Sequence, residues 1–326
     1  MKALQFTHQG RPEIVKSEVP EIAEDEVLVA ARSVGVCHSD IDLLEGSYII
    51  PFNYPIIPGH EWAGEVVKVG SRVVNLAPGD RVVGECVIGD DHFGFSISGA
   101  AADFFVAKPT WLHKLPDSLS YTMGALVEPF SVAYYALTRV GNVNASDTLV
   151  VLGAGPVGLA VTAAAAAMGA VTVVVEPSEA RREISRQLGA QYAVHPDEID
   201  GLLESVTDGR GADVVVEVSG RPAVMARALE LVAFKGRVAY VGINVGDDAP
   251  AKLGLIQSKE LKITGSIGSP GVWPDTLRFL ANSGIDMTPL VTQHFDVDHA
   301  LEALEAAHDG HSTIKAHIEF TATLHD

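Results

Sequence analysis

The fold of this chain is decided by the stretch Thr148-Leu149-Val150-Val151-Leu152-Gly153-Ala154-Gly155-Pro156-Val157-Gly158. It reads as a buried strand that runs into a Gly-x-Gly-x-x-Gly turn, and a helix is predicted from Val157 to Met168. Glycines with this spacing allow a tight turn, a close backbone approach to a pyrophosphate and close packing of helix on strand. The helix N-terminus then presents free amides to the phosphates. The stretch predicts a dinucleotide-binding unit, with contacts at Gly153, Gly155, Pro156, Val157 and Gly158.

The residues after this helix support the same unit. A strand of valine and threonine, Val171–Val175, ends in Glu176, about 20 residues beyond the glycines, where an acid binds the ribose hydroxyls of a dinucleotide. An acid at that place also repels a 2′-phosphate, so NAD is favoured over NADP. Arg181 and Arg182 follow closely and could bind a phosphate, and Arg181 is taken as a further cofactor contact.

Helices and strands continue to alternate as far as residue 267. Helices are predicted over 178–188, 197–207 and 222–232, and strands over 191–194, 213–218, 237–241 and 261–266. This alternation predicts an α/β fold with a doubly wound parallel sheet and right-handed crossovers. Ligands of such sheets bind beyond the carboxyl ends of the strands. Cofactor contacts are therefore expected at Ser219, Val241, Ile243 and Ser266.

The rest of the chain differs from this pattern. Residues before 148 read as short β segments with turns, followed by one helix over 130–138. After residue 268, helices are predicted over 273–282 and 297–308, and a last strand over 314–320. The uncharged run 148–175 is long enough to span a bilayer, but its glycines and its proline divide it into strand, turn, helix and strand, which argues against a membrane segment.

A second pattern supplies side chains that can bind a metal. The loop at Gly59-His60-Glu61 leads into an alternating strand and puts an imidazole beside a carboxylate. Cys37 lies in a loop-like polar run after the apolar strand 27–30. Zinc takes Cys, His and carboxylate ligands in tetrahedral sites, and a catalytic site keeps its fourth position for water or substrate. Cys37 and His60 are therefore predicted to be two of three protein ligands of a catalytic zinc.

The third ligand is predicted to be a carboxylate, for which the sequence offers two candidates. Glu128 is flanked by apolar residues, where a carboxylate is costly to bury unless it is paired or bound to a metal. Pro129 disfavours helical geometry at Glu128, so a helix break is expected there. Glu61 adjoins His60 and competes for the same place. The choice between Glu61 and Glu128 stays open.

Composition limits the classes of partner. The chain has 326 residues, which suggests about two domains, with 23 Lys and Arg against 42 Asp and Glu. The net charge of −19 opposes binding to nucleic acid or to an anionic membrane. Two cysteines cannot form a disulfide framework, a thiolate ligand fits a reducing compartment, and the first residues lack the apolar stretch of a signal peptide. A cytoplasmic enzyme with no nucleic-acid or membrane partner is expected.

These patterns, in this order, resemble a zinc-dependent member of the medium-chain dehydrogenase/reductase superfamily, and the likeness covers nearly the whole chain. It is carried by residues 35–40, 59–70, 78–82, 126–133 and 153–158. A glutamate at the third ligand position, Glu128, resembles the sorbitol, galactitol and threonine dehydrogenase branch. The resemblance implies a mostly β, GroES-like catalytic domain from residues 1–130 and 268–326, a Rossmann domain from 131–267, and a homodimer or homotetramer.

Two departures from the family pattern affect these expectations. The family commonly carries four closely spaced cysteines that bind a structural zinc, but region 84–94 has only Cys86, so one catalytic zinc and no structural zinc are predicted. Many alcohol dehydrogenases have a relay histidine where this chain has Asp42. Proton release would then use Ser39 with a ribose hydroxyl, water, or Asp42 itself.

The resemblance implies transfer of hydride between NAD and a small secondary alcohol, such as a polyol, a cyclitol or an amino alcohol. Ser39 is expected to accept the alcohol proton beside His60 and Glu61, and His38 and Lys315 are expected to contact the cofactor phosphates. Candidates for the substrate pocket are Tyr48, Phe52, Asn53, Trp62, Phe93 and Trp273. Two alternatives are a zinc-free quinone or enone reductase of the same fold, which has no reason to keep the three zinc ligands together, and a non-catalytic relative.

Overall fold

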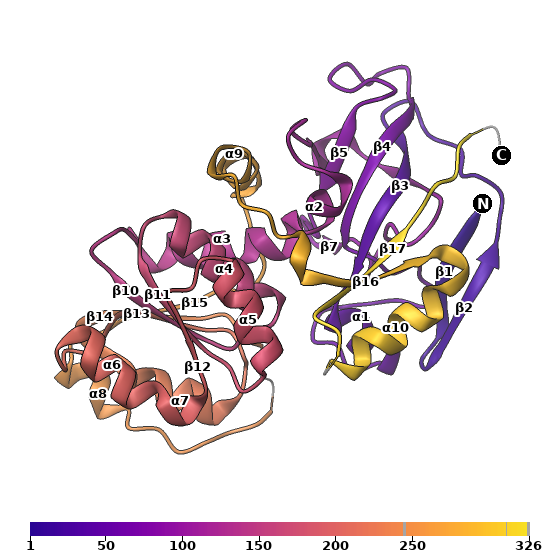
Figure 1. Cartoon of the computed structure of the whole chain (residues 1–326). Helices are drawn as coiled ribbons and strands as arrows, with labels where there is room; N and C mark the ends of the chain where they lie inside the picture. The colour runs from indigo at the N-terminus through magenta and orange to yellow at the C-terminus, as the bar shows by residue number, and fades with distance from the viewer. Residues whose placement is uncertain (244–245, 311, 325–326) are drawn as a thin grey trace. The chain divides into compact units, whose positions relative to one another are not determined.

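The computed structural model describes residues 1–243, 246–310 and 312–324, and the chain divides into two compact units (Figure 1). The first unit comprises Met1–Glu128, Trp273–Ala281 and Val291–Asp326, and the second comprises Pro129–Val272 and Asn282–Leu290. Residues 129–130, 268–272 and 282–290 thus group with the second unit, whereas they were expected in the first. None of the helices in the described part of the chain combines the length and apolar character needed to cross a membrane.

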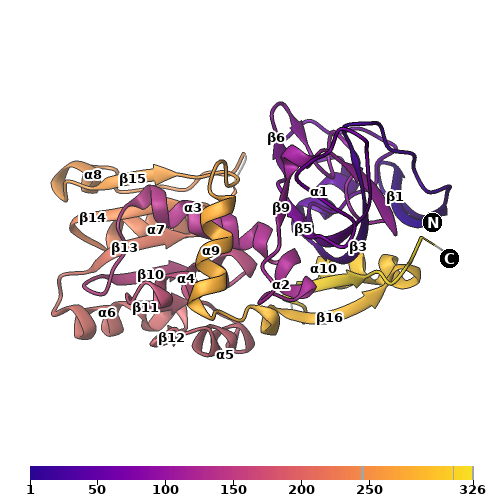
Figure 2. The same ribbon diagram turned by 90° about the horizontal axis from the view of Figure 1, so that it is seen from above.

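The second unit contains a six-stranded sheet in which every neighbouring pair is parallel (Figure 2). In sheet order the strands are β12 Tyr192–Val194, β11 Val171–Val175, β10 Thr148–Leu152, β13 Ala212–Glu217, β14 Val232–Tyr240 and β15 Lys262–Gly265. The helices are α4 Pro156–Ala167, α5 Glu179–Gln187, α6 Ile199–Thr207, α7 Pro222–Leu231 and α8 Gly254–Ser258. Helices α4 and α5 lie on one side of the sheet, and α6 and α7 on the other (Figure 1). This order confirms the predicted doubly wound sheet.

The predicted fingerprint turn forms between β10 and α4. All five residues of β10 are buried, and Gly153 then adopts a φ of 107°, which side-chain-bearing residues rarely adopt. Gly155 caps α4, and Pro156 occupies its first turn, where a missing amide hydrogen costs nothing. A Cβ on Gly158 would lie 2.1 Å from the carbonyl oxygen of Gly153. Only glycine therefore allows helix and strand to approach this closely.

Two boundaries near and within the second unit differ from the prediction. Helix α3 spans Val127–Val140, so it begins before Pro129 and includes Glu128 in its first turn. The expected break lies just upstream, between α3 and the short helix α2, Tyr121–Ala125, because proline is tolerated in a first turn. Strand β14 begins at Val232, five residues before the predicted start, because Val232 pairs with Ala212 before a register shift interrupts the ladder.

The first unit is built on a mostly antiparallel sheet in the order β16-β17-β3-β4-β5-β9, with β8 also paired to β3. Among the described residues of this sheet, β16 and β17 form the one parallel pair. The strands of this unit are β1 Lys2–His8, β2 Arg11–Lys16, β3 Val27–Val36, β4 Glu61–Val69, β5 Arg81–Gly84, β6 Val87–Ile88, β7 Asp91–His92, β8 Phe104–Ala107, β9 Leu112–Lys114, β16 Val291–Asp296 and β17 Lys315–Glu319. The remaining helices are α1 His38–Glu45, α9 Trp273–Ser283 and α10 Ala300–Asp309. Short 3₁₀ turns are η1 Pro109–Trp111 and η4 Val297–His299 in the first unit, and η2 Pro196–Glu198 and η3 Thr288–Leu290 in the second.

The region around Cys37 is more regular than the sequence suggested. Strand β3 continues past the expected end at residue 30 and ends at Val36, because it pairs with β4, β8 and β17 and is almost entirely buried. Helix α1 follows at once, with Cys37 as its N-cap and the Asp40 carboxylate accepting a hydrogen bond from the Cys37 amide at 2.9 Å. Strand β16, which the sequence did not predict, precedes η4 and α10.

Candidate metal and cofactor sites

Three side chains of the first unit converge as a metal site requires. One ligand atom each from Cys37, His60 and Glu61 lies within 4.8 Å of the other two. The sheet explains this meeting, because β3 ends just before Cys37 while β4 begins at Glu61, and Gly35 pairs with Glu61 in the antiparallel ladder. A thiolate, an imidazole and a carboxylate form a three-ligand set of the kind that holds a catalytic zinc with one open position. The donor set therefore fits this metal.

A carboxylate lies behind the imidazole of His60. His60 is buried, and its Nδ1 lies 3.4 Å from Asp40 Oδ1, while its Nε2 lies 3.4 Å from Ser39 Oγ. Burial acts against the charged form, but Asp40 and Cys37 hold the pKa of His60 well above its usual value. A carboxylate beside the nitrogen that does not bind the metal orients a ligating histidine. Asp40 is not among the predicted site residues, although its place three residues after the N-cap is a sequence signal for capping.

Glu61 is paired with a buried lysine from the far end of the chain. Lys315 Nζ donates a hydrogen bond to Glu61 Oε1 at 2.8 Å, lies 2.7 Å from Oε2, and also donates to Val36 O at 3.2 Å. Both side chains are almost fully buried. Burial alone would lower the pKa of Lys315, but Glu61 and Cys37 raise it. Lys315 is predicted from the sequence to reach the cofactor phosphates. In the structure its ammonium group pairs with Glu61 instead.

Glu128 belongs to the same electrostatic neighbourhood without being one of the three converging ligands. Burial raises its pKa to about 7, while His60 opposes this rise and Glu61 adds to it. The carboxylate thus lies close enough to sense both groups. The ligand atoms that meet within 4.8 Å, however, are those of Cys37, His60 and Glu61.

The surroundings of the metal ligands are aromatic. The Phe95 ring lies 4.9 Å from the His60 ring and 4.8 Å from the Tyr48 ring, which stacks on it. Burial raises the pKa of the Tyr48 phenol, and electrostatic interactions with His60 and Cys37 place that phenol near the site. Burial also raises the pKa of the Cys86 thiol to about 12. Tyr48 is the best placed of the predicted pocket residues.

Other predicted pocket residues are used for packing or local bonding. Trp62 and Phe93 are each 2% exposed and lie 5.9 Å apart in the hydrophobic core. Trp273, also 2% exposed, stacks on His113. The Asn53 amide donates to Ser96 O at 3.0 Å. Phe52 packs edge-on against a neighbouring tyrosine. The sequence could not distinguish an aromatic side chain in the core from one in a pocket.

The residues of the first unit that are predicted to move the alcohol proton, and His38, which is predicted to contact the cofactor phosphates, lie together at the start of α1. His38 is its first residue, is exposed, and lies 3.8 Å from the carboxylate of Asp42. Ser39 follows it, with its hydroxyl directed at His60. Burial raises the pKa of Asp42. One helical turn thus combines a hydroxyl beside the metal ligands with two groups nearer the surface that can exchange protons.

In the second unit, Glu176 ties the end of β11 to the fingerprint turn. Its Oε2 accepts a hydrogen bond from Ala154 N at 2.8 Å, and its Oε1 accepts one from Ser178 N at 3.0 Å. The carboxylate is therefore held beside the glycines that approach the pyrophosphate, where an acid contacts the ribose. The glycine turn and the acid together form a cradle that fits a dinucleotide.

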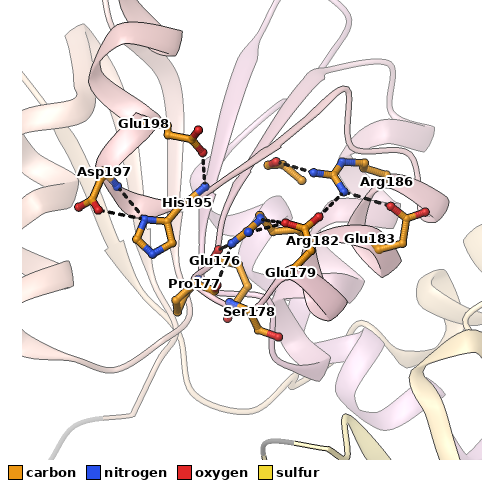
Figure 3. A network of polar contacts seen from close by, with 11 residues as sticks. Glu176, Pro177, Ser178, Glu179, Arg182, Glu183, Arg186, His195, Asp197 and Glu198 are labelled. Carbon is orange, nitrogen blue, oxygen red and sulfur yellow. Dashed lines mark hydrogen bonds and ion pairs between the residues drawn. The ribbon is translucent and has the colours of Figure 1, made fainter.

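The two arginines after Glu176 are engaged within the protein. Arg182 donates to the carbonyl oxygens of Glu176 and Pro177, at 2.5 and 2.8 Å, and forms an ion pair with Glu179 (Figure 3). Arg181 donates to Ala154 O at 3.4 Å, so it reaches the fingerprint turn. Arg182 is thereby held to the first residue of α5 and to the segment just before that helix.

The remaining predicted cofactor contacts follow the carboxyl ends of three strands. Ser219 comes after β13, Val241 and Ile243 come after β14, and Ser266 comes after β15. Ser219 Oγ donates to the carboxylate of Glu217, and Ile243 is 52% exposed. Because the strands are parallel, these residues lie at the same edge of the sheet as the fingerprint turn. Glu217, a buried acid at this edge, was not singled out from the sequence.

Comparisons with known proteins agree with this pair of sites. Residues 23–117 match the family model of the alcohol dehydrogenase GroES-like domain, and residues 156–282 match that of the zinc-binding dehydrogenases. The chain is 33% identical to a sorbitol dehydrogenase of Bacillus subtilis, with 94% of this chain and 93% of that protein covered. It is 28% identical to a D-arabitol-phosphate dehydrogenase of Enterococcus avium, with 92% of each covered.

A solved structure extends the likeness to three dimensions. The 2R,3R-butanediol dehydrogenase of Bacillus subtilis superposes with a TM-score of 0.88 at 30% identity, covering 98% of this chain and 99% of that one. The match includes both units, and it agrees with the GroES-like and Rossmann architectures described above. The chain therefore belongs to the zinc-type medium-chain alcohol dehydrogenases, in their sorbitol dehydrogenase-like branch, a family of oxidoreductases that use zinc and a nicotinamide dinucleotide.

Proposed function

We propose that this enzyme transfers hydride between NAD and a secondary alcohol, which is a polyol, a cyclitol or an amino alcohol. The convergence of Cys37, His60 and Glu61 is the observation that carries the proposal. The relatives named for sorbitol, arabitol phosphate and butanediol support the substrate class, because each of those compounds has a hydroxyl beside another hydroxyl-bearing carbon.

Cys37, His60 and Glu61 are the proposed zinc ligands, with Glu128 as a nearby carboxylate that does not bind the metal directly. A bound zinc would act as a Lewis acid and lower the pKa of the substrate hydroxyl. Lys315 offsets part of the negative charge of the thiolate and the carboxylate. Asp40 holds the His60 ring, so that its other nitrogen stays directed at the site. One zinc per chain is proposed, because region 84–94 offers only Cys86 as a thiolate.

Ser39 Oγ is the proposed acceptor of the alcohol proton. It lies 3.4 Å from His60 Nε2, so it is adjacent to the metal ligands. A hydroxyl can accept one proton while it donates its own, which makes it a relay and not a final base. His38 and Asp42, on the same helix, are the groups that can take the proton toward solvent.

NAD is the proposed cofactor, with NADP disfavoured. The Glu176 carboxylate is held beside the fingerprint turn by Ala154 N, where its charge repels a 2′-phosphate. Arg182 is occupied by two carbonyl groups and Glu179, so it is not free to offset that repulsion. The proposed contacts beyond the turn are His38, Arg181, Ser219, Val241, Ile243 and Ser266.

A homodimer or homotetramer in the cytoplasm is also proposed. In the described part of the chain, β15 pairs only with β14, so its other edge is open. An open edge with exposed apolar side chains favours association with another chain. Ile263 on β15 is 36% exposed, and Phe234 and Ile267 are 58% and 62% exposed. The free thiolate among the zinc ligands fits a reducing compartment.

A substrate panel tests the proposal. Purified protein would be assayed with polyols, aminocyclitols, threonine and simple alcohols, each with NAD and with NADP, before and after treatment with a chelator. We expect oxidation of at least one polyol with NAD, loss of activity on chelation and recovery with zinc. Activity on enones that survives chelation would instead identify a zinc-free reductase, and inactivity of zinc-loaded protein on every secondary alcohol would refute the mechanism.

A further inference from the structure

A buried carboxylate lies directly beneath the cofactor edge of the Rossmann sheet. Glu217, the last residue of β13, is 0% exposed. Its Oε1 accepts hydrogen bonds from Ser219 N at 2.7 Å, from Ser219 Oγ at 2.5 Å and from Gly220 N at 3.1 Å. In the described part of the chain no basic side chain pairs with this carboxylate. A buried charge is costly, so its bonds to this turn are its main compensation.

The turn that Glu217 holds packs against the fingerprint turn. Val218 Cγ2 lies 3.4 Å from the place where a Cβ on Gly153 would stand, and 2.9 Å from the corresponding place on Gly158. The two glycines therefore leave room for Val218. Any shift of the turn 218–220 moves a side chain that rests on the residues facing the pyrophosphate.

The same turn also packs against the segment after β14. The main-chain oxygen of Glu217 accepts hydrogen bonds from Val241 N and Gly242 N, at 2.9 and 3.1 Å. A Cβ on Gly242 would lie 2.1 Å from Gly220 N, so the two backbones are in direct contact. Glu217 thus bonds to two turns at this edge, through its side chain and its backbone.

The place of β13 in the sheet makes this edge the site of cofactor binding. Strand β13 lies beside β10, and strand order reverses at this pair, since β11 and β12 extend to one side while β14 and β15 extend to the other. In open parallel sheets ligands bind in the crevice beyond the strand ends at such a point. The turn 218–220 is therefore beside the expected path of the dinucleotide.

We propose that Glu217 is a positioning residue for the dinucleotide, whose carboxylate keeps the turn 218–220 in the shape that receives the cofactor. The inference rests on the dinucleotide site proposed above. It also changes the role of Ser219. Its hydroxyl gives its single hydrogen to Glu217 and accepts a hydrogen bond from Arg221 N at 3.2 Å. The proposed cofactor contact of Ser219 is therefore assigned to its main chain, and its hydroxyl is assigned to the turn.

The test compares two substitutions that differ in one respect. Glu217→Met keeps the length of the side chain and removes both oxygen acceptors, whereas Glu217→Gln keeps one oxygen to accept from the turn. NADH dissociation constants would be measured by fluorescence on the full, zinc-loaded protein. We expect Glu217→Met to raise the constant about tenfold or more, and Glu217→Gln to raise it about three- to fivefold. The KM for NAD is expected to rise more than kcat falls.

A matched control separates positioning from a general loss of stability. Thr207 is a buried residue of the same unit at the opposite end of β13, where its hydroxyl donates to Leu203 O and accepts from Gly211 N. Thr207→Val is expected to lower the melting temperature and leave the NADH constant within about twofold. Ser219→Ala, which leaves both amide bonds to Glu217, is expected to change the constant by less than about threefold.

Several results would overturn the proposal. One is an unchanged NADH dissociation constant in Glu217→Met. Another is a rise in this constant that Thr207→Val also shows when its melting temperature falls by the same amount. A larger effect of Ser219→Ala than of Glu217→Gln would mean that the hydroxyl itself binds the cofactor. If Glu217→Met does not fold, an unchanged constant in Glu217→Gln is decisive against the proposal. Failure of the wild-type protein to bind NADH would instead refute the proposed cofactor site.

Discussion

Lys315 and Glu61 form a buried ion pair that joins the last strand of the first unit to the strand that begins with a proposed zinc ligand. Lys315 Nζ lies 2.8 Å from Glu61 Oε1, and the two side chains are 3% and 1% exposed. Because the pair lies next to Cys37 and His60, it reduces the net negative charge that the ligand set gathers when it is ionised. The pair therefore connects stability with metal binding.

Removing the lysine is expected to destabilise the metal-free protein. Lys315→Met leaves the Glu61 charge buried without its partner, which costs about 3–5 kcal/mol of unfolding free energy. Adding Glu61→Gln removes the unpaired buried charge, so the double variant is expected to regain part of the lost unfolding free energy. Urea unfolding of chelated protein measures both. A loss below about 1 kcal/mol in the single variant would mean that the pair contributes no more to stability than an exposed ion pair does.

The two candidate carboxylate ligands are expected to respond differently to neutralisation. Glu61→Gln removes one of the three converging ligands, so zinc content after dialysis against a chelator is expected to fall as far as in Cys37→Ser. Glu128→Gln is expected to retain zinc, because its carboxylate is not among the converging atoms. Metal analysis of the three variants is the measurement. Loss of zinc from Glu128→Gln alone would assign the ligand to Glu128.

Cofactor preference is expected to depend on the charge of Glu176. Glu176→Gln keeps an acceptor for Ala154 N but removes the charge that repels a 2′-phosphate. The ratio of kcat/KM for NAD to that for NADP is expected to fall about tenfold, which corresponds to about 1.4 kcal/mol. Glu183→Gln is the matched control, since Glu183 is an exposed acid on helix α5 that pairs with Arg186 and not with Arg182. An equal fall in the control would point to general charge and not to the ribose contact.

The features that the sequence predicted correctly are those whose cause is local. The glycines from Gly153 to Gly158 define their turn by backbone conformation, and the alternation after Glu176 defines the parallel sheet. Lys315 shows the limit of this reasoning. Its ammonium group meets Glu61 only because β17 pairs with β3 and β3 pairs with β4, a chain of strand pairings across 254 residues of sequence. No local pattern records such a contact.

Burial sets a second limit on what the sequence can show. Trp62 and Tyr48 are both aromatic residues near the metal loop, but one is 2% exposed in the core while the other stacks on Phe95 near the ligands. Strand β3 was predicted too short because Arg32 and Ser33 interrupt its apolar run, although both remain within the sheet. Whether a polar residue can lie inside a strand depends on its hydrogen-bond partners. The Ser33 hydroxyl has such a partner in His317 Nδ1, at 2.9 Å.

His317 is expected to make the protein sensitive to acid. Its imidazole is fully buried in β17, and burial, reinforced by Lys315 and His294, lowers its pKa to about 3. Above about pH 6.5 the ring is neutral in both states. As the pH falls below that value, the unfolded chain takes up a proton that the folded chain refuses, so the folded state loses stability down to about pH 3.

A comparison with His317→Asn isolates this effect. Asparagine can still bond to Ser33 but does not titrate, so the variant is less stable at pH 7 yet loses less on acidification. Between pH 7 and pH 5 the wild-type protein is expected to lose about 2 kcal/mol more unfolding free energy than the variant. Urea unfolding of chelated protein at both pH values measures the difference, with the exposed His308→Asn as control. Equal losses in wild type and His317→Asn would mean that the buried ring accepts a proton in the folded state.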